Sequence, residues 1–138
     1  LRSKLLKLSK LKNVSFIGSV VSIQNVLQES TLLISPFTVP HFSRPVIEAF
    51  AYGKPVIVSD VAGMEEIVDH QSNGLIIANG DSNALAVSIN KLVFDKDLLM
   101  KMGNNGREKA IKYYSPIQNM SIIENIYRQL SPNNIQQD

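Results

Sequence analysis

The sequence of 138 residues contains no cysteine and only two histidines, His41 and His70. Without cysteine there are no disulfide bonds and no thiolate metal sites, and neither histidine has neighbours at metal-ligand spacing. The same absences leave no nucleophile, base and orienting group for a catalytic triad. We therefore expect no bound metal and no cofactor. A cytoplasmic location is also expected, because cysteine-free chains suit a reducing compartment.

Long hydrophobic runs are absent as well, since no stretch approaches the roughly 20 apolar residues of a membrane-spanning helix. Neither a GxGxxG nor a Walker A sequence occurs, although both are common phosphate-binding loops. The chain also begins at Leu1, without a methionine or a signal-like segment. We expect it to be a piece of a longer protein.

Acidic residues are missing before Glu29, whereas five of the 14 basic residues lie there. This imbalance predicts a basic leading helix with Leu1, Leu5 and Leu8 on one side. Two interpretations stay open: a solvated helix face in front of a strand, or a peripheral contact with anionic lipid or a phosphate-bearing ligand. The rest of the chain has more acidic than basic side chains, and the bases are not interleaved with aromatics, so we expect no nucleic-acid partner.

The apolar residues, 44% of the chain, are enough for one domain with a sizeable core. They include four short runs that alternate with helix-like segments, which is typical of a parallel sheet. These runs are Val14–Ile17, Leu32–Ser35, Pro55–Ser59 and Leu75–Ala78. Because each run is continuous, helices should cover both faces. We predict an α/β fold, a doubly wound Rossmann-like parallel sheet, over residues 1–130, and a disordered polar tail over 131–138.

The helices between these runs carry start and stop signals. A helix over Arg44–Tyr52 should end at Gly53, because glycine is the common residue after a helix C-terminus. Asp81 or Ser82 should cap a later helix. The apolar stripe of that helix comprises Leu85, Ile89, Leu92 and Val93.

Two further helices follow along the chain. Asp97 should cap the first, which extends to about Tyr113. Gly103 and Gly106 weaken its middle by about 1 kcal/mol each relative to alanine, which allows a kink or break there. The second begins after Ser115 and Pro116, and its apolar stripe comprises Ile123, Ile126, Tyr127 and Leu130.

Ligands of open α/β sheets bind beyond the carboxyl ends of the strands, which directs attention to four loops. These loops are Gly18–Ile23, Pro36–Arg44, Asp60–Gly63 and Asn79–Asp81. Helix N-termini converge there, and their N–H groups and dipoles favour anions. A phosphorylated ligand is therefore the expected partner.

Glu48 is an acid among apolar neighbours in the helix after the second loop, and it needs a polar partner. Hydroxyl groups of a ribose or hexose would serve, and so would Arg44, four residues earlier on the same helix face. The loop before this helix contains two prolines, two aromatic residues and His41. His41 is either part of a binding surface or a plain exposed residue, and Phe42 either joins that surface or folds onto the core.

Four segments of the chain are similar to one family in order and spacing. They are NVSFIG, RPVIEAFAYGKPVIVSD, AGMEEIVDHQSNGLII, and MGNNGREKAIKYYS followed by IYRQL. Over about Asn13 to Leu130 the chain resembles the C-terminal, nucleotide-sugar-binding half of GT-B glycosyltransferases of the group 1 (family 4) type. The resemblance implies a partial GT-B donor-binding domain. It also implies retaining, metal-independent transfer of a sugar from a nucleotide diphosphate sugar to an acceptor.

The resemblance assigns the donor site residue by residue. Glu48 would hold the ribose hydroxyls, and the loop before it would offer backbone amides to the sugar and the diphosphate. That loop and the adjoining helical turn comprise His41, Phe42, Ser43, Arg44 and Val46. Gly18 and Val20 would border the base. The last helix would cross back onto the N-terminal domain of the complete enzyme.

Two departures from the family are visible. The family often has a second glutamate eight residues before the retained one, and Pro40 stands there instead. This change implies an altered sugar contact; the alternative is a non-catalytic Rossmann-like binding or assembly module derived from such an enzyme. In addition, the diphosphate-binding Arg and Lys and the acceptor domain would lie before Leu1, so the chain alone should not turn over.

The family's strand order, 3-2-1-4-5-6, leaves a gap in this chain. Two absent strands would sit between Val14–Ile17 and Leu32–Ser35. We therefore predict that these two runs pair directly, or that another chain fills the gap, as in an oligomer. A run over 14–17 that is unpaired and solvated would count against both options.

Overall fold

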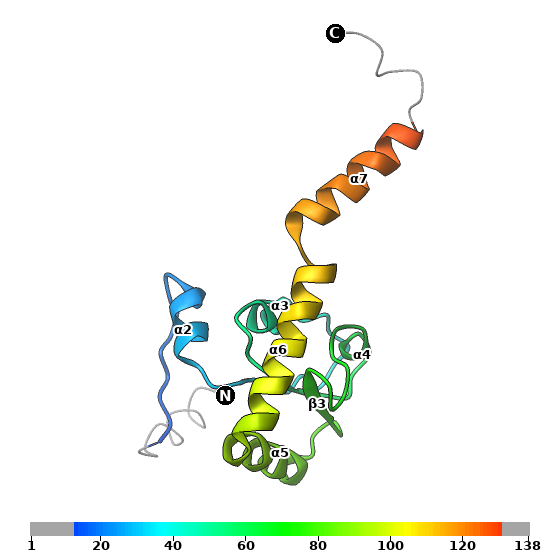
Figure 1. Cartoon of the computed structure of the whole chain (residues 1–138). Helices are drawn as coiled ribbons and strands as arrows, with labels where there is room; N and C mark the ends of the chain where they lie inside the picture. Colours follow the sequence, from blue (N-terminus) through cyan, green and yellow to red (C-terminus); the bar gives the residue numbers. More distant parts are fainter. Residues whose placement is uncertain (1–12, 131–138) are drawn as a thin grey trace.

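The computed structural model describes residues 13–130, in which helices alternate with three parallel strands (Figure 1). The strands are β1 (Leu33–Ser35), β2 (Val56–Ser59) and β3 (Gly74–Ile77). The helices are α2 (Ile23–Glu29), α3 (Arg44–Ala51), α4 (Met64–Ile67), α5 (Ser82–Phe94), α6 (Lys96–Tyr113) and α7 (Pro116–Leu130). The expected basic helix at the start and the polar tail at 131–138 lie outside the described residues.

The sheet has the order β1-β2-β3, with β2 in the middle. Ile57 of β2 pairs with Ile34 of β1 on one side and with Leu75 of β3 on the other. All four residues of β2 are buried, as expected for a central parallel strand covered on both faces. Three of the four predicted runs are therefore confirmed as strands, with boundaries shifted by about one residue.

The fourth predicted run, Val14–Ile17, forms no strand, and its direct pairing with the Leu33–Ser35 strand is wrong. Phe16 and Ile17 are more than half exposed. The run has the composition of a strand, but strand formation needs a neighbouring strand to satisfy its N–H and C=O groups. Within residues 13–130, β1 is paired only with β2, and its other edge is open. The unpaired, exposed state of 14–17 also counts against the second option, that another chain fills the gap.

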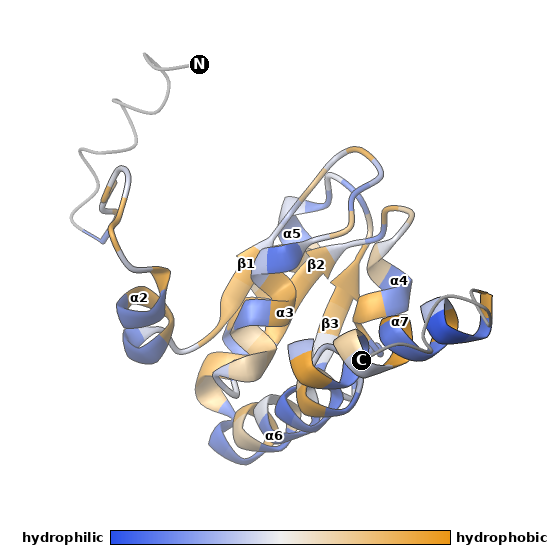
Figure 2. Cartoon of the chain, turned by 90° about the horizontal axis from the view of Figure 1, so that it is seen from above, coloured by the Kyte–Doolittle hydropathy of each residue, from blue (hydrophilic) through white to orange (hydrophobic). Residues whose placement is uncertain are grey.

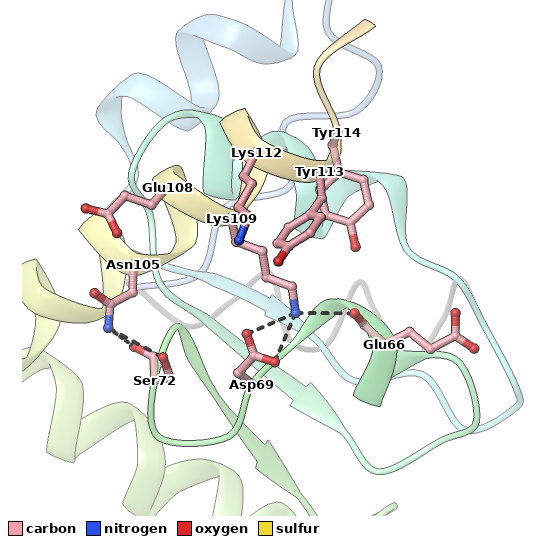
Figure 3. A pocket seen from close by; sticks show the side chains of 9 residues that line it. All are labelled: Glu66, Asp69, Ser72, Asn105, Glu108, Lys109, Lys112, Tyr113 and Tyr114. Atoms are coloured by element: carbon pink, nitrogen blue, oxygen red, sulfur yellow. Dashed lines mark hydrogen bonds and ion pairs between the residues drawn. The ribbon is translucent and has the colours of Figure 1, made fainter. Parts of the chain in front are cut away.

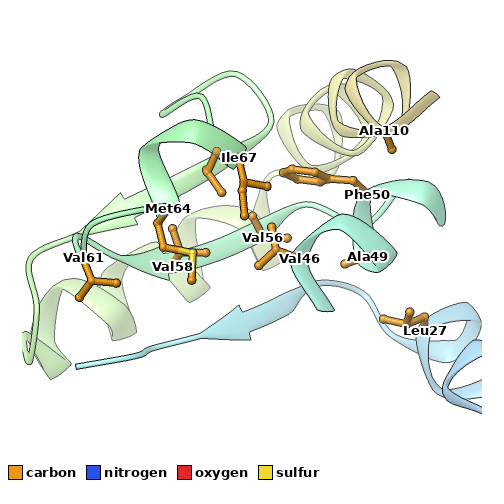
Figure 4. Close-up of a cluster of buried hydrophobic side chains, with 11 residues drawn as sticks. Leu27, Val46, Ala49, Phe50, Val56, Val58, Val61, Met64, Ile67 and Ala110 are labelled. Atoms are coloured by element: carbon orange, nitrogen blue, oxygen red, sulfur yellow. The ribbon is translucent and has the colours of Figure 1, made fainter. Parts of the chain in front are cut away.

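Helices cover both faces of the sheet, because alternate residues of β2 point in opposite directions. On one face, Val56 and Val58 pack with α3, α4 and the end of α6 around Phe50 (Figure 4). On the other face, Ile57 packs with Leu92 of α5 and Met102 of α6. The doubly wound α/β architecture is thus confirmed for the described residues, and Figure 2 shows the apolar strands between the helices.

Helix α6 contributes to both faces, with Met102 in one cluster and Ala110 in the other. It runs without a break through Gly103 and Gly106, so the break that these glycines allow does not occur. A Cβ atom at Gly103 would overlap the carbonyl oxygen of Gly53, and one at Gly106 would overlap the ring of Phe50. The two glycines therefore allow α6 to pack directly against the end of α3.

Helix caps explain the remaining boundaries. Asp81 caps α5 as predicted, and its Oδ1 accepts a hydrogen bond from the Ala84 N–H at 2.8 Å. Asp95, rather than the expected Asp97, caps α6 by accepting from the Leu98 N–H at 2.9 Å. Val93 is 46% exposed and does not join the buried stripe of α5, because the sheet-facing side of the helix ends at Leu92.

Helix α7 projects away from the sheet (Figure 1) and has no buried residue. Its predicted apolar stripe is present but uncovered in the described part of the chain. The members of the stripe, Ile123, Ile126, Tyr127 and Leu130, are between 46% and 75% exposed. No helix within 13–130 is long and apolar enough to cross a membrane.

Candidate functional site

The carboxyl ends of the three strands lie along one edge of the sheet, because the strands are parallel and in register. The loops that follow them, residues 36–43, 60–63 and 78–81, therefore lie side by side. In this fold class, that edge is where ligands bind.

The loop over residues 36–43 is held by both neighbouring loops. The side-chain amide of Asn79 donates to the Thr38 carbonyl at 3.2 Å. The N–H of His41 donates to the Ala62 carbonyl at 3.0 Å. The imidazole of His41 also stacks on Phe37, with ring centroids 3.8 Å apart. The loop is thus fixed in place before any ligand binds.

Helix α3 begins directly after this loop, with Ser43 as its N-cap. The Ser43 side chain is fully buried, and its Oγ lies 3.4 Å from Oγ of Ser35 at the end of β1. The Val46 N–H donates to the Ser43 carbonyl at 3.1 Å. Pro45 has no N–H to satisfy, which suits the first turn of a helix.

Three backbone amides at this helix start carry no hydrogen bond to any part of the chain between residues 13 and 130. They belong to Phe42, Ser43 and Arg44. They lie at the positive end of the α3 dipole, where N–H groups attract anions. Ser43 is fully buried, so the arrangement offers the amides of the two exposed residues, Phe42 and Arg44, to a negatively charged or hydroxyl-bearing ligand.

Two of the residues expected at the donor site use their backbone N–H groups in hydrogen bonds within the chain. The His41 N–H is bonded to Ala62, which leaves its imidazole, not its amide, for a ligand. The Val46 side chain is fully buried in the core and its N–H is bonded to Ser43. Phe42, by contrast, is 54% exposed and does not fold onto the core.

Glu48 lies one turn into α3 with its side chain about one-third exposed. Its Oε1 is 3.3 Å from Nε of Arg44, so the ion pair that the sequence left open is present. Arg44 is 87% exposed, and ion pairs of this kind contribute only about 0.5 kcal/mol. A ligand hydroxyl can therefore replace the arginine at little cost.

Gly18 and Val20 are not brought to this edge. They lie in the exposed segment before α2, which Figure 2 shows standing apart from the loops of the sheet. The reason is the missing strand at 14–17, which would have fixed the position of this segment. The predicted donor residues thus gather at α3, apart from these two.

A cavity of about 670 Å³ lies elsewhere, between α4, the turn before β3 and the end of α6 (Figure 3). There the Lys109 ammonium donates to both carboxylate oxygens of Asp69, at 3.0 and 2.9 Å, and to the Glu66 carbonyl at 3.3 Å. Asn105 donates to the Ser72 carbonyl at 2.9 Å. These bonds tie α6 to the turn before β3. No sequence signal could have found them, because the partners are 33 to 43 residues apart.

The chain was compared with known proteins. The family model of glycosyl transferases group 1 matches residues 1–109. The putative glycosyltransferase EpsD of Bacillus subtilis is 30% identical over 107 residues, which are 78% of this chain and 28% of EpsD. The capsular polysaccharide biosynthesis glycosyltransferase CapM of Staphylococcus aureus is 31% identical over 113 residues, 82% of this chain and 30% of CapM. The chain thus spans about three-tenths of these relatives.

Solved structures are similar over nearly the whole chain. Anabaena HepE in complex with UDP has a TM-score of 0.82 at 26% identity, covering 91% of this chain and 35% of HepE. Sucrose-phosphate synthase from Thermosynechococcus elongatus has a TM-score of 0.83 at 29% identity, covering 94% and 33%. The fold and the family model agree with the resemblance of the sequence motifs to GT-B enzymes. The chain belongs to the family of glycosyl transferases group 1.

Proposed function

We propose that the chain binds the nucleotide diphosphate sugar donor in a retaining, metal-independent glycosyltransferase. The observation that carries this proposal is the start of α3, where two exposed residues with unbonded amides, Phe42 and Arg44, lie about one helical turn before Glu48. Membership in the family supports it, and so does the similarity to HepE, which has been solved with UDP and with UDP-glucose.

Each group at this helix start has a role in the proposed site. The amides of Phe42 and Arg44 bind diphosphate or sugar oxygens, assisted by the dipole of α3. Glu48 accepts hydrogen bonds from the ribose hydroxyls in exchange for Arg44. The protein's contribution to the reaction is to orient the donor and to stabilise the departing diphosphate by charge.

Pro40 supports a second candidate function. It occupies the position at which the family often has a glutamate that would touch the transferred sugar, and proline offers no such acid. In this alternative the chain is a non-catalytic Rossmann-like binding or assembly module, which retains the α3 site but transfers no sugar. If the chain is part of an active glycosyltransferase, the acceptor is a sugar, a lipid or a protein.

The proposed enzyme includes more than the described residues. The uncovered apolar stripe of α7 would pack on another domain of the full-length protein, and further strands of that protein would cover the open edge of β1. The basic segment before Asn13 would contact phosphate groups of the ligand or of a membrane surface.

Calorimetric titration of the full-length protein with UDP-, GDP- and ADP-sugars tests the proposal. We expect one donor to bind, and Glu48→Ala to raise its Kd by about tenfold, as expected for a lost hydrogen bond to a charged group. Glu108→Ala is the matched control, since Glu108 is an exposed glutamate of α6 away from the strand ends. A wild-type protein that binds none of these nucleotides would refute the donor site.

A further inference from the structure

The loop after β2 touches the proposed donor loop through backbone atoms. Gly63 has a φ of +96°, and a Cβ atom built on it would lie 3.0 Å from the carbonyl oxygen of His41. The same Cβ would be 3.4 Å from the His41 carbonyl carbon and 3.7 Å from the Phe42 nitrogen. A Cβ contact at 3.0 Å is tighter than nine in ten real Cβ contacts. Gly63 therefore lies against the peptide group that joins His41 to Phe42.

The residue before Gly63 fixes the same stretch of the loop from its other end. The Ala62 carbonyl accepts the hydrogen bond of the His41 N–H at 3.0 Å. Both ends of His41 are thus in contact with one short segment, Ala62–Gly63. The peptide that carries the first unbonded amide, that of Phe42, is held by this segment and not by a side chain.

We propose that Gly63 is a positioning residue for the donor loop, an inference that rests on the proposed function. Because Gly63 has no side chain, its backbone can lie against His41, and this contact sets where the amides of Phe42, Ser43 and Arg44 point. Gly63 does not touch the donor itself. Its effect reaches the ligand only through the loop.

Alanine at position 63 has two separate costs. The first is the left-handed backbone conformation, which L side chains rarely adopt. The second is the contact of the new Cβ with the His41 carbonyl, which must move by a few tenths of an ångström. Hydrogen bonds weaken steeply when their geometry is lost, so a displaced peptide loses affinity for the diphosphate.

Gly53, at the far end of α3 from the donor loop, separates these two costs. It also has a positive φ, +65°, but the nearest atom to a Cβ built on it is 3.9 Å away, an ordinary contact. Gly53→Ala therefore has the backbone cost alone, whereas Gly63→Ala has both. Gly63→Ala should lose more thermal stability, and only Gly63→Ala should disturb the loop.

Two measurements on the full-length protein test the proposal. The first is the ¹H–¹⁵N spectrum without ligand, in which Gly63→Ala should shift the amides of Phe42, Ser43 and Arg44 and Gly53→Ala should not. The second is calorimetric titration with UDP, GDP and ADP. Relative to Gly53→Ala, we expect Gly63→Ala to raise the Kd of the nucleotide that binds wild-type protein by about tenfold or more.

The two measurements fail in different ways. Unchanged amide positions at 42–44 in Gly63→Ala, or nucleotide affinity equal to that of Gly53→Ala, overturn the positioning role while the donor site stands. Wild-type protein that binds none of the three nucleotides overturns the donor site, and with it the positioning of that site, whatever the spectra show.

Discussion

Tyr114 directly follows Tyr113, the last residue of α6. Its side chain is partly buried and lies near two carboxylates. Burial raises the pKa of its phenol above the ordinary value of 10.0, and the charges of Asp69 and Glu66 raise it further. The causes are physical: a phenolate there would lose hydration and would be repelled by both acids. The neutral phenol is therefore favoured in the folded protein.

Because the pKa of Tyr114 is raised in the folded protein, part of the free energy of unfolding depends on pH in the alkaline range. Above about pH 10 the unfolded chain releases the Tyr114 proton while the folded chain retains it, so the free energy of unfolding falls as the pH rises. We expect this fall to be shallower in Tyr114→Phe. Urea unfolding between about pH 8 and pH 11 measures it.

Tyr127→Phe, on the uncovered helix α7, is the control for the loss of a phenol. A Tyr114→Phe variant with the same pH dependence as wild type would show that the three side chains do not interact in solution.

Single residues also show where sequence reasoning succeeds. The cap at Asp81 and the ion pair of Arg44 with Glu48 were predictable, because both depend on neighbours three or four positions apart. Which amides at the start of α3 lack a hydrogen bond was not predictable from the sequence. It depends on Ala62 accepting the His41 N–H, a contact between two loops that only the folded sheet brings together.

Among the helices, the packing of α6 on α3 reverses the usual effect of glycine. In an exposed helix, alanine in place of glycine would stabilise by about 1 kcal/mol. At Gly103 the added methyl group would overlap the Gly53 carbonyl oxygen, which belongs to the turn after α3. Overpacking of this kind costs about 1 to 3 kcal/mol.

We therefore expect Gly103→Ala to lower the free energy of unfolding by up to about 2 kcal/mol, the balance of these two effects. Asn104→Ala is the matched control, because Asn104 is the exposed next residue of the same helix. That variant should be neutral or slightly stabilising. Chemical denaturation of both variants decides the matter, and a stabilised Gly103→Ala would contradict the close contact.

The strands show why local patterns were only partly sufficient. The three confirmed runs succeed because each finds a parallel neighbour within the chain, so that composition and pairing agree. The run over Val14–Ile17 has suitable composition but no neighbour, and β propensity depends strongly on such context. Gly18 and Val20 then follow an unanchored segment, which is why their expected place beside the base is not reached.

For the molecule as a whole, α7 is an appendage of the described fold. None of its residues is buried, and its apolar side chains include Ile117, Met120 and Leu130. Apolar patches of this kind on a soluble protein commonly mark an interface. Its contribution to the stability of residues 13–115 should be small.

Removal of residues 116–138 from this chain should therefore leave the melting temperature within about 4 °C, the shift that corresponds to roughly 1 kcal/mol in a domain of this size. The shortened chain should also self-associate less, as measured by size-exclusion chromatography at several concentrations. A larger loss of melting temperature would show that α7 packs on the sheet in solution.

Helix α6 packs in the hydrophobic clusters on both faces of the sheet, and this packing affects how cooperatively the protein unfolds. Met102 and Ala110 are parts of one helix, so detaching α6 would uncover both faces of the sheet at once. Neither layer can then open as an independent foldon, and the slowest-exchanging amides of both should report the same global unfolding. The α3 helix, held against α6, belongs to that same cooperative unit, although its first amides stay open to ligand.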